Sequence, residues 1–168
     1  GAVWVTRRRG NGPVADLGLA VRPLDVPLGL ALGVVLQLVV PLLYAPFGQW
    51  VSSRDLEQPA RDLVHQFPTT PSKVLLVVMV CVCAPVTEEL LYRGLLLRGL
   101  ERRLGPLVAV VVSAVVFGLM HFEPLQTPGL VAFGLVAGLL AWRTGRLGPS
   151  MAMHLAFNAT SVVLIWMR

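Results

Sequence analysis

Apolar residues fill five long stretches of the chain, and short segments rich in proline, glycine and charge separate them. The stretches cover residues 26–47, 74–97, 106–122, 129–142 and 149–166. All but the fourth come close to the roughly 20 residues with which an α-helix crosses the hydrocarbon core of a bilayer. The pattern predicts an all-α fold, a polytopic transmembrane helical bundle of about five spans.

Prolines and glycines mark where these helices should bend or end. Pro41 and Pro46 should bend or end the first helix, because proline lacks the N–H group that a helix interior uses. Gly-Pro pairs at 105–106 and 148–149 predict tight turns. A new helix should follow each turn, since proline is well tolerated in a first helical turn.

The polar connection 48–72 between the first two helices predicts a further helix that lies at the membrane surface. Its apolar residues are loosely spaced as on one helix face: Leu56, Leu63, Val64 and Phe67. Pro59 should interrupt this interfacial helix, because a proline in a helix interior removes a backbone hydrogen bond.

The composition agrees with a membrane protein. Apolar residues make up 55% of the 168 residues and charged residues 14%, against roughly half and a quarter in soluble domains. This balance argues against a soluble enzyme. The net charge of +5 does not indicate a nucleic-acid partner, because the basic residues flank apolar helices instead of gathering on one accessible surface.

The distribution of Lys and Arg predicts the orientation of the helices. Alternating crossings place ten basic residues on one side: Arg7, Arg8, Arg9, Arg22, Arg93, Arg98, Arg102, Arg103, Arg143 and Arg146. The opposite side receives four: Arg54, Arg61, Lys73 and Arg168. This bias predicts a multi-pass protein of the cell membrane with its N-terminus in the cytoplasm and its C-terminus outside.

Few ionisable side chains interrupt the apolar helices, and each needs an explanation, because a charge at bilayer depth is costly and is kept mainly for function or pairing. Glu89 and Arg93 are four residues apart, so they can form an ordinary ion pair on one helix face. Glu88 shares its face with Tyr92 instead, and no cation lies there within one turn. Glu88 is therefore the charge left for chemistry, with a protonated, hydrogen-bonded carboxyl group as the alternative.

The other polar residues of interest are His121, His154 and Asn158. Either histidine alone is more commonly explained by a hydrogen bond to a backbone carbonyl. The predicted heights of these residues in the bilayer favour a shared site instead. Glu88 and His121 lie 16 to 17 residues from the turn near Gly105, so an antiparallel hairpin places them at one height. At 1.5 Å per residue they are about 25 Å from that turn, and His154 is about 11 Å from its own. The groups meet in the cytoplasmic third of the bilayer if the hairpin of the second and third helices projects roughly 14 Å further into the cytoplasm.

A carboxylate, two imidazoles and an amide in a dry site suit hydrolysis. The carboxylate and one histidine can hold and deprotonate a water molecule, while a second histidine and an asparagine can donate hydrogen bonds to the oxyanion. Alternatively, Glu88, His121 and His154 could hold a zinc ion with an open water position, although the sequence lacks the compact H-E-x-x-H motif. We favour direct water activation, because asparagine is a poor zinc ligand.

Three motifs carry a resemblance to a known family. EELLYR at 88–93 resembles E-E-x-x-x-R, FGLMH at 117–121 resembles F-x-x-x-H, and HLAFN at 154–158 resembles H-x-x-x-N. These motifs, in this order, are those of the CPBP or Abi intramembrane proteases, a family of CAAX proteases and bacteriocin-processing enzymes. Its members usually carry more than five helices, so the resemblance implies an N-terminally shortened copy.

The resemblance implies an intramembrane endopeptidase, either a metalloendopeptidase or a glutamate-type hydrolase, that acts near the cytoplasmic face. Its implied partners are membrane lipid and a membrane-anchored peptide or protein substrate, prenylated or bacteriocin-like. Glu88 and His121 would hold the attacking water, and His154 and Asn158 would hold the oxyanion. The implied supporting residues are Glu89, Arg93, Tyr92 and Phe117.

On this view the chain divides into two parts. Residues 1–72 hold a cytoplasmic arm, the first transmembrane helix and an external loop, and residues 73–168 hold a protease core of four helices. Two other functions stay open: a proton-coupled transporter, since intramembrane Glu and His residues also build proton relays, and a non-catalytic immunity or scaffold protein. A polar cluster near one face and no inverted repeat weigh against the transporter.

Overall fold

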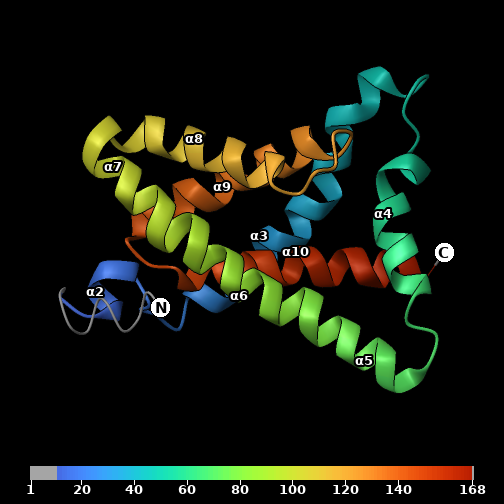
Figure 1. Cartoon of the computed structure of the whole chain (residues 1–168), viewed down its shortest axis with the longest axis horizontal. Coiled ribbons are helices and arrows are strands. Elements are labelled where there is room, and N and C mark those ends of the chain that lie inside the picture. Colours follow the sequence, from blue (N-terminus) through green and yellow to red (C-terminus); the bar gives the residue numbers. More distant parts are fainter. Residues whose placement is uncertain (1–10, 168) are drawn as a thin grey trace.

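The computed structural model describes residues 11–167 of the chain. Arg7, Arg8, Arg9 and Arg168, which enter the predicted orientation, lie outside the described residues. Within residues 11–167 every regular element is a helix, and the helices pack as a bundle (Figure 1). The predicted all-α class is therefore confirmed.

The helices have the following bounds. In chain order they are α2 (Pro13–Leu17), α3 (Asp25–Val39), η1 (Val40–Phe47), α4 (Ser53–His65), α5 (Thr70–Val78), η2 (Met79–Cys83), α6 (Ala84–Glu89), η3 (Leu90–Leu97), α7 (Arg98–Leu104), α8 (Pro106–Leu119), α9 (Thr127–Thr144) and α10 (Gly148–Trp166). The η1 segment is a 3₁₀-helix, whereas η2 and η3 are π-helical. Among the described residues three helical stretches are long and apolar enough to cross a membrane: Asp25–Phe47, Thr70–Leu104 and Thr127–Thr144.

The second helical stretch is longer than predicted. It runs for 35 residues, Thr70–Leu104, instead of 74–97. A capping box between Thr69 and Ser72 starts it early. The stretch then continues until Gly105, whose φ of 78° ends the helix. Two π-helical segments interrupt its α-helical geometry, one before and one after the Glu-Glu pair.

The third helix, α8, is shorter than predicted. It ends at Leu119 instead of residue 122, because Phe122 adopts a left-handed backbone conformation with φ of 55° and Pro124 follows it. His121 therefore lies in a turn beyond the helix and not on a helical face. The fourth helix, by contrast, extends over 18 residues, Thr127–Thr144, and reaches spanning length.

Proline acts as predicted in the first helix but not in the interfacial segment. The α-helix of the first stretch gives way to the 3₁₀-helix η1, which contains Pro41 and Pro46. Pro59 lies inside an uninterrupted α4, so the predicted interruption is wrong. A proline removes one backbone donor, and the side-chain amide of Gln126 donates to the nearby carbonyl oxygen of Leu56 at 2.7 Å. This contact adds a donor beside the proline and joins α4 to the turn before α9.

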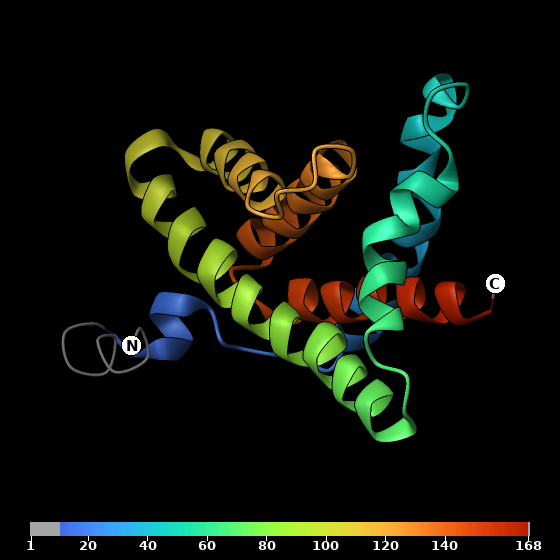
Figure 2. The same ribbon diagram turned by 45° about the vertical axis from the view of Figure 1, so that its right-hand side comes forward.

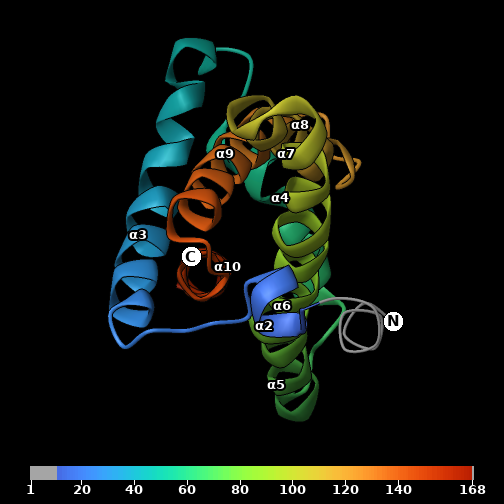
Figure 3. The ribbon, with the colours of Figure 1, turned by 90° about the vertical axis from the view of Figure 1, so that its left-hand side faces the viewer.

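Helices α3 and α10 pack closely against each other (Figure 3). Gly29 and Gly33, one turn apart on α3, face the backbone of α10. A Cβ atom at Gly29 would lie 2.5 Å from the carbonyl oxygen of Pro149, and one at Gly33 would overlap the carbonyl oxygen of Met153. Small residues four apart permit this close approach in membrane helices. The contact therefore fixes the position of α10, which carries His154.

The connections between helices lie at two ends of the bundle. In Figure 1, α2, the α7–α8 turn and the α9–α10 turn are at the left, whereas α4 and the C-terminus are at the right. Both Figure 1 and Figure 2 show the α7–α8 turn reaching further out than the α9–α10 turn. At the same end Arg98, the first residue of α7, donates to the carbonyl oxygen of Gly145 at 2.8 Å, so the start of α7 is in contact with the α9–α10 turn.

Candidate active site

Glu89 and Arg93 form a fully buried ion pair. Neither side chain is accessible to solvent, and Arg93 Nη1 lies 2.9 Å from Glu89 Oε1. Their spacing puts them on one face of the helical stretch, as predicted. Arg93 Nη2 also donates to the carbonyl oxygen of Gly134 on α9 at 3.3 Å. The guanidinium group therefore joins the helix of the glutamates to α9.

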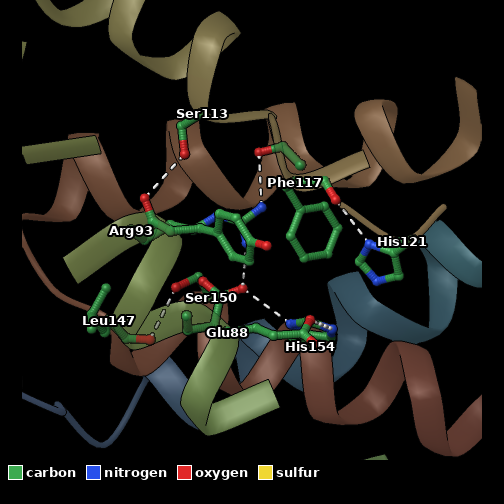
Figure 4. Close-up of polar contacts among 11 residues, drawn as sticks. Glu88, Arg93, Ser113, Phe117, His121, Leu147, Ser150 and His154 are labelled. Carbon is green, nitrogen blue, oxygen red and sulfur yellow. Dashed lines mark hydrogen bonds and ion pairs between the residues drawn. The ribbon is translucent and has the colours of Figure 1, made fainter. Parts of the chain in front are cut away.

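His154 of α10 lies between the two carboxylates (Figure 4). Its Nδ1 is 3.1 Å from Glu89 Oε1, and its Nε2 is 3.7 Å from Glu88 Oε2. Because a carboxylate only accepts, Nδ1 carries a proton in the contact with Glu89. The distance to Glu88 exceeds that of a direct hydrogen bond, and the Glu88 side chain is 29% accessible. Glu89 is thus the enclosed carboxylate and Glu88 the open one.

Aromatic rings enclose this polar group. The guanidinium carbon of Arg93 lies 4.5 Å from the ring centre of Phe117, which is a cation–π contact. The ring of Phe133 is 4.6 Å from that of His154, and Tyr92 packs edge-on against Phe117 with 5.2 Å between ring centres. All three aromatic side chains are buried. They keep the surroundings apolar, and charges interact more strongly in such surroundings than in water.

His121 contacts the same phenyl ring. The ring centre of Phe117 is 4.7 Å from that of His121 and 5.8 Å from that of His154, so both imidazoles lie against one side chain. His121 Nδ1 is 2.8 Å from the carbonyl oxygen of Phe117. Because a carbonyl only accepts, Nδ1 is the protonated nitrogen, and it provides a donor at the end of α8. In the neutral ring Nε2 then carries a lone pair.

Asn158 lies one turn beyond His154 on α10, and its amide reaches the backbone of another helix. Asn158 Nδ2 donates to the carbonyl oxygen of Val80 at 2.9 Å. Val80 belongs to η2, the π-helical segment that precedes the glutamates. One of the two amide N–H groups of the predicted oxyanion donor is therefore engaged by a contact within the protein.

The structure brings four of the predicted residues into direct contact: Glu88, Glu89, Arg93 and His154. The predicted supporting residues Tyr92 and Phe117 line this group. His121 adjoins it through the ring of Phe117, and Asn158 holds the helix segment before it.

Three contacts of the site were not predicted. They involve the ring of Phe133, the carbonyl group of Gly134 and the hydroxyl group of Ser113, which donates to the carbonyl oxygen of Tyr92 at 3.0 Å. The first two residues lie in the middle of an apolar helix, and no polar or spacing signal marks them. Ser113 is a polar residue inside an apolar stretch, so that position alone could have indicated a role.

The donor arrangement does not fit a three-ligand zinc site. Among the described residues no group of three His, Cys, Asp or Glu side chains is placed to hold a metal ion. This includes Glu88, His121 and His154, which the sequence offers as a zinc set.

A buried group of Glu, Arg and His side chains with one open carboxylate, held among membrane-length apolar helices, defines a helical membrane protein with a candidate acid–base site. Residues 70–160, more than half of the chain, match the family described as type II CAAX prenyl endopeptidase Rce1-like. The chain belongs to this family, which confirms the family relationship inferred from the three motifs.

A curated relative comes from Bacillus subtilis (strain 168) and is named "Putative membrane peptidase YdiL". It is 24% identical over 90 residues, which cover 54% of this chain and 37% of that protein. The matched part thus spans little more than a third of the relative's length. No solved structure matches the chain.

Proposed function

We propose that this protein is an intramembrane endopeptidase in which Glu88 activates a water molecule to hydrolyse a peptide bond of a membrane-anchored substrate. The observation that carries the proposal is the position of His154 between two glutamates with unequal surroundings, 3.1 Å from the enclosed Glu89 and 3.7 Å from the open Glu88. Membership of a family named for an endopeptidase supports the same reaction class.

Glu88 suits the role of general base because its carboxylate is the one left accessible. Glu89 is occupied by Arg93 and His154, whereas the gap between Glu88 and His154 is too long for a direct bond and suits a bridging water. The family motif assigns His121 to the same water, and its Nε2 lone pair is the group that would accept the hydrogen bond. As the water oxygen attacks the peptide carbonyl carbon, Glu88 takes its proton.

His154 suits the role of oxyanion donor. Nδ1 binds the Glu89 carboxylate, which orients the ring, and a proton on Nε2 would be donated to the tetrahedral oxyanion. When the intermediate collapses, the C–N bond breaks and Glu88 returns its proton to the leaving nitrogen. The products are a carboxylate and a protonated amine. Arg93 holds the Glu89 side chain in place through their ion pair.

We place the cytoplasm at the end of the bundle that carries α2 and the α7–α8 turn. Basic residues gather at that end, which supports a cytoplasmic location: Arg98, Arg102, Arg103 and Arg146. In this orientation the N-terminus is cytoplasmic and the C-terminus is outside. A prenylated or bacteriocin-like substrate, anchored in the inner leaflet, then approaches Glu88 from the cytoplasmic side.

The test uses the whole chain in liposomes with a fluorescent, farnesylated peptide that ends in Cys-aliphatic-aliphatic-X. Glu88→Gln should lower kcat by about 10²- to 10⁴-fold, the usual contribution of a general base. Glu101→Gln is the matched control, since it makes the same change in α7 of the same helical stretch, and it should keep the wild-type rate. A wild-type rate in Glu88→Gln contradicts the proposal. Proton-coupled flux without cleavage products would favour a transporter instead.

Metal content distinguishes glutamate-type from metal-dependent hydrolysis. Direct water activation predicts that dialysis of the purified protein against EDTA leaves the cleavage rate unchanged. Stoichiometric zinc, with activity lost on chelation and restored by zinc, would contradict direct water activation.

A further inference from the structure

Asn158 contacts a carbonyl group that a proline deprives of its helical donor. At the end of η2 the backbone N–H of Ala84 donates to the carbonyl oxygen of Met79, five residues earlier, which is the π-helical pattern. In the same register the next N–H would serve the carbonyl of Val80. The next residue is Pro85, which has no N–H.

The side-chain amide of Asn158 supplies this missing donor. Its Nδ2 lies 2.9 Å from the carbonyl oxygen of Val80. Pro85 is fully buried, and α10 packs against both η2 and α6. Within a bilayer, backbone groups freed by proline must be satisfied by neighbouring helices, because the hydrocarbon offers no water. Helix α10 therefore replaces, through Asn158, the hydrogen bond that Pro85 cannot make.

We propose that Asn158 is a positioning residue that acts through Val80 and Pro85. By holding the Val80 carbonyl it fixes the local geometry of the helical stretch at Pro85, three residues before Glu88. Asn158 and His154 share one helix, so this contact ties the height of His154 to that of Glu88. This role differs from the oxyanion contact expected from the family motif, and its catalytic consequence rests on the proposed function.

Ser113 provides a matched comparison on the other side of the glutamates. Its hydroxyl group donates to the carbonyl oxygen of Tyr92 in η3, at 3.0 Å. Residues 93–97 contain no proline, so the N–H groups of the helix itself stay available to that carbonyl. Loss of the Ser113 hydroxyl should therefore matter less than loss of the Asn158 amide, and it should not depend on Pro85.

The test is a double-mutant cycle in the whole chain, with kcat, KM and Tm measured for each variant in the liposome and detergent assays. Asn158→Ala should lower kcat on the order of tenfold to a hundredfold, as small misplacements of reacting groups do, with KM little changed. Pro85→Ala restores a backbone N–H. Added to Asn158→Ala it should recover most of the lost kcat and Tm, whereas added to Ser113→Ala it should recover neither.

An oxyanion donor would give a different result. Because alanine cannot donate from its side chain, the combined Pro85→Ala and Asn158→Ala variant would stay as slow as Asn158→Ala even with Tm restored, and that outcome overturns the positioning role. Additive Tm changes in the cycle overturn the replacement of the Pro85 N–H by Asn158, whether or not the protein cleaves peptides. An unchanged rate in Glu88→Gln overturns the proposed function and leaves the Tm cycle interpretable.

A second variant keeps the test valid if Pro85→Ala does not fold. At a pH at which the new carboxyl group is ionised, Asn158→Asp has the same shape but directs a carboxylate oxygen at the carbonyl oxygen of Val80, so two acceptors face each other. Its Tm should fall below that of Asn158→Ala. An equal or higher Tm contradicts the contact.

Discussion

Two arginine–carboxylate pairs in this protein have the same chemistry but differ in how completely they are bonded. Arg146 binds Asp25 through two nitrogens, Nε at 2.9 Å and Nη2 at 2.6 Å, and the backbone N–H of Arg22 adds a third bond to Asp25 at 2.7 Å. Arg93 reaches Glu89 through one nitrogen. Its Nε has no hydrogen-bond partner among the described residues.

The difference separates a structural pair from a pair that belongs to a site. Asp25 uses both oxygens to join the start of α3 to the α9–α10 turn, so each of its oxygens is hydrogen-bonded. Glu89 uses one oxygen for both Arg93 and His154, which couples the arginine to an imidazole beside the open Glu88. The incomplete pair is also the more deeply buried. Breaking the Glu89–Arg93 pair should therefore lower both the stability of the protein and its rate of peptide cleavage.

Removal of Arg93 should produce the largest effect. Arg93→Met leaves the Glu89 carboxylate uncompensated in the core and should destabilise the protein by about 3–5 kcal/mol, with cleavage lost. The double variant Glu89→Met with Arg93→Met should regain much of the stability, because no unpaired charge stays buried. It should not regain cleavage, since His154 has lost its partner. Chemical unfolding in detergent and the peptide assay measure the two properties. A double variant as unstable as the single one contradicts this account of the pair.

Substitution at Gly33 should have the next largest effect on stability, because α10 packs directly against this glycine. Helix α10 follows the turn that holds Arg146 and carries His154 beside Glu89. Gly33→Ala forces a Cβ atom into the α10 backbone and should cost about 1–3 kcal/mol, the usual range for overpacking. The matched control is Gly99→Ala on α7, where an added Cβ meets no atom within 4 Å. Alanine favours helices over glycine, so this variant should be neutral or slightly more stable. Equal unfolding midpoints for the two variants would exclude close α3–α10 packing.

Substitution at Arg146 should affect stability less than substitution at Arg93 and should spare catalysis. Arg146→Met should lower Tm, while kcat per folded molecule stays at the wild-type value. Because Arg146 is 17% accessible, the Tm difference should also shrink between 0.1 M and 1 M salt, as screening increases. The Tm difference for Arg93→Met should not. A loss of kcat comparable to that of Arg93→Met would end the distinction between the two pairs.

The sequence predicts what depends on neighbours along the chain. Apolar stretch lengths predicted the helical bundle, and the i,i+4 spacing of Glu89 and Arg93 predicted their pair. The sequence also indicated Glu88 as the charge without a local partner. It misplaced the ends of helices, because the left-handed conformation of Phe122 and the tolerance of α4 for Pro59 depend on contacts with other segments.

Contacts across the bundle were not predictable in the same way. The pair of Asp25 and Arg146 joins residues 121 positions apart, and nothing in either local sequence indicates the partner. The same holds for Phe133 against His154, because an aromatic residue in an apolar helix gives no sign of the face it occupies. The donor role of Asn158 toward Val80 required the register of a π-helical segment, which the sequence does not reveal.

Substitution of a third carboxylate, Asp55, should have the smallest effect on stability. Asp55 is exposed, whereas the carboxylates of the two arginine pairs are buried. Its partners are the hydroxyl and backbone N–H of Ser52, at 2.7 and 2.9 Å from Oδ2. These hydrogen bonds hold the pKa of Asp55 below its ordinary value. The stabilisation of α4 by this capping box is therefore fully present above the unfolded pKa, about 4, and is lost as pH falls through the folded pKa.

The Tm difference between wild type and Asp55→Ala should accordingly be small near pH 6 and should vanish in strong acid. Amide hydrogen exchange at Ser52 reports the same loss locally, because its backbone N–H loses its carboxylate acceptor once Asp55 is protonated. The hydroxyl of Ser52 still bonds the backbone N–H of Asp55, so Ser52→Ala should remove a contribution that acid does not. A Tm difference for Asp55→Ala that persisted below the folded pKa would mean that the side chain acts through packing and not through its charge. Asp55 would then no longer serve as the exposed reference for the two arginine pairs.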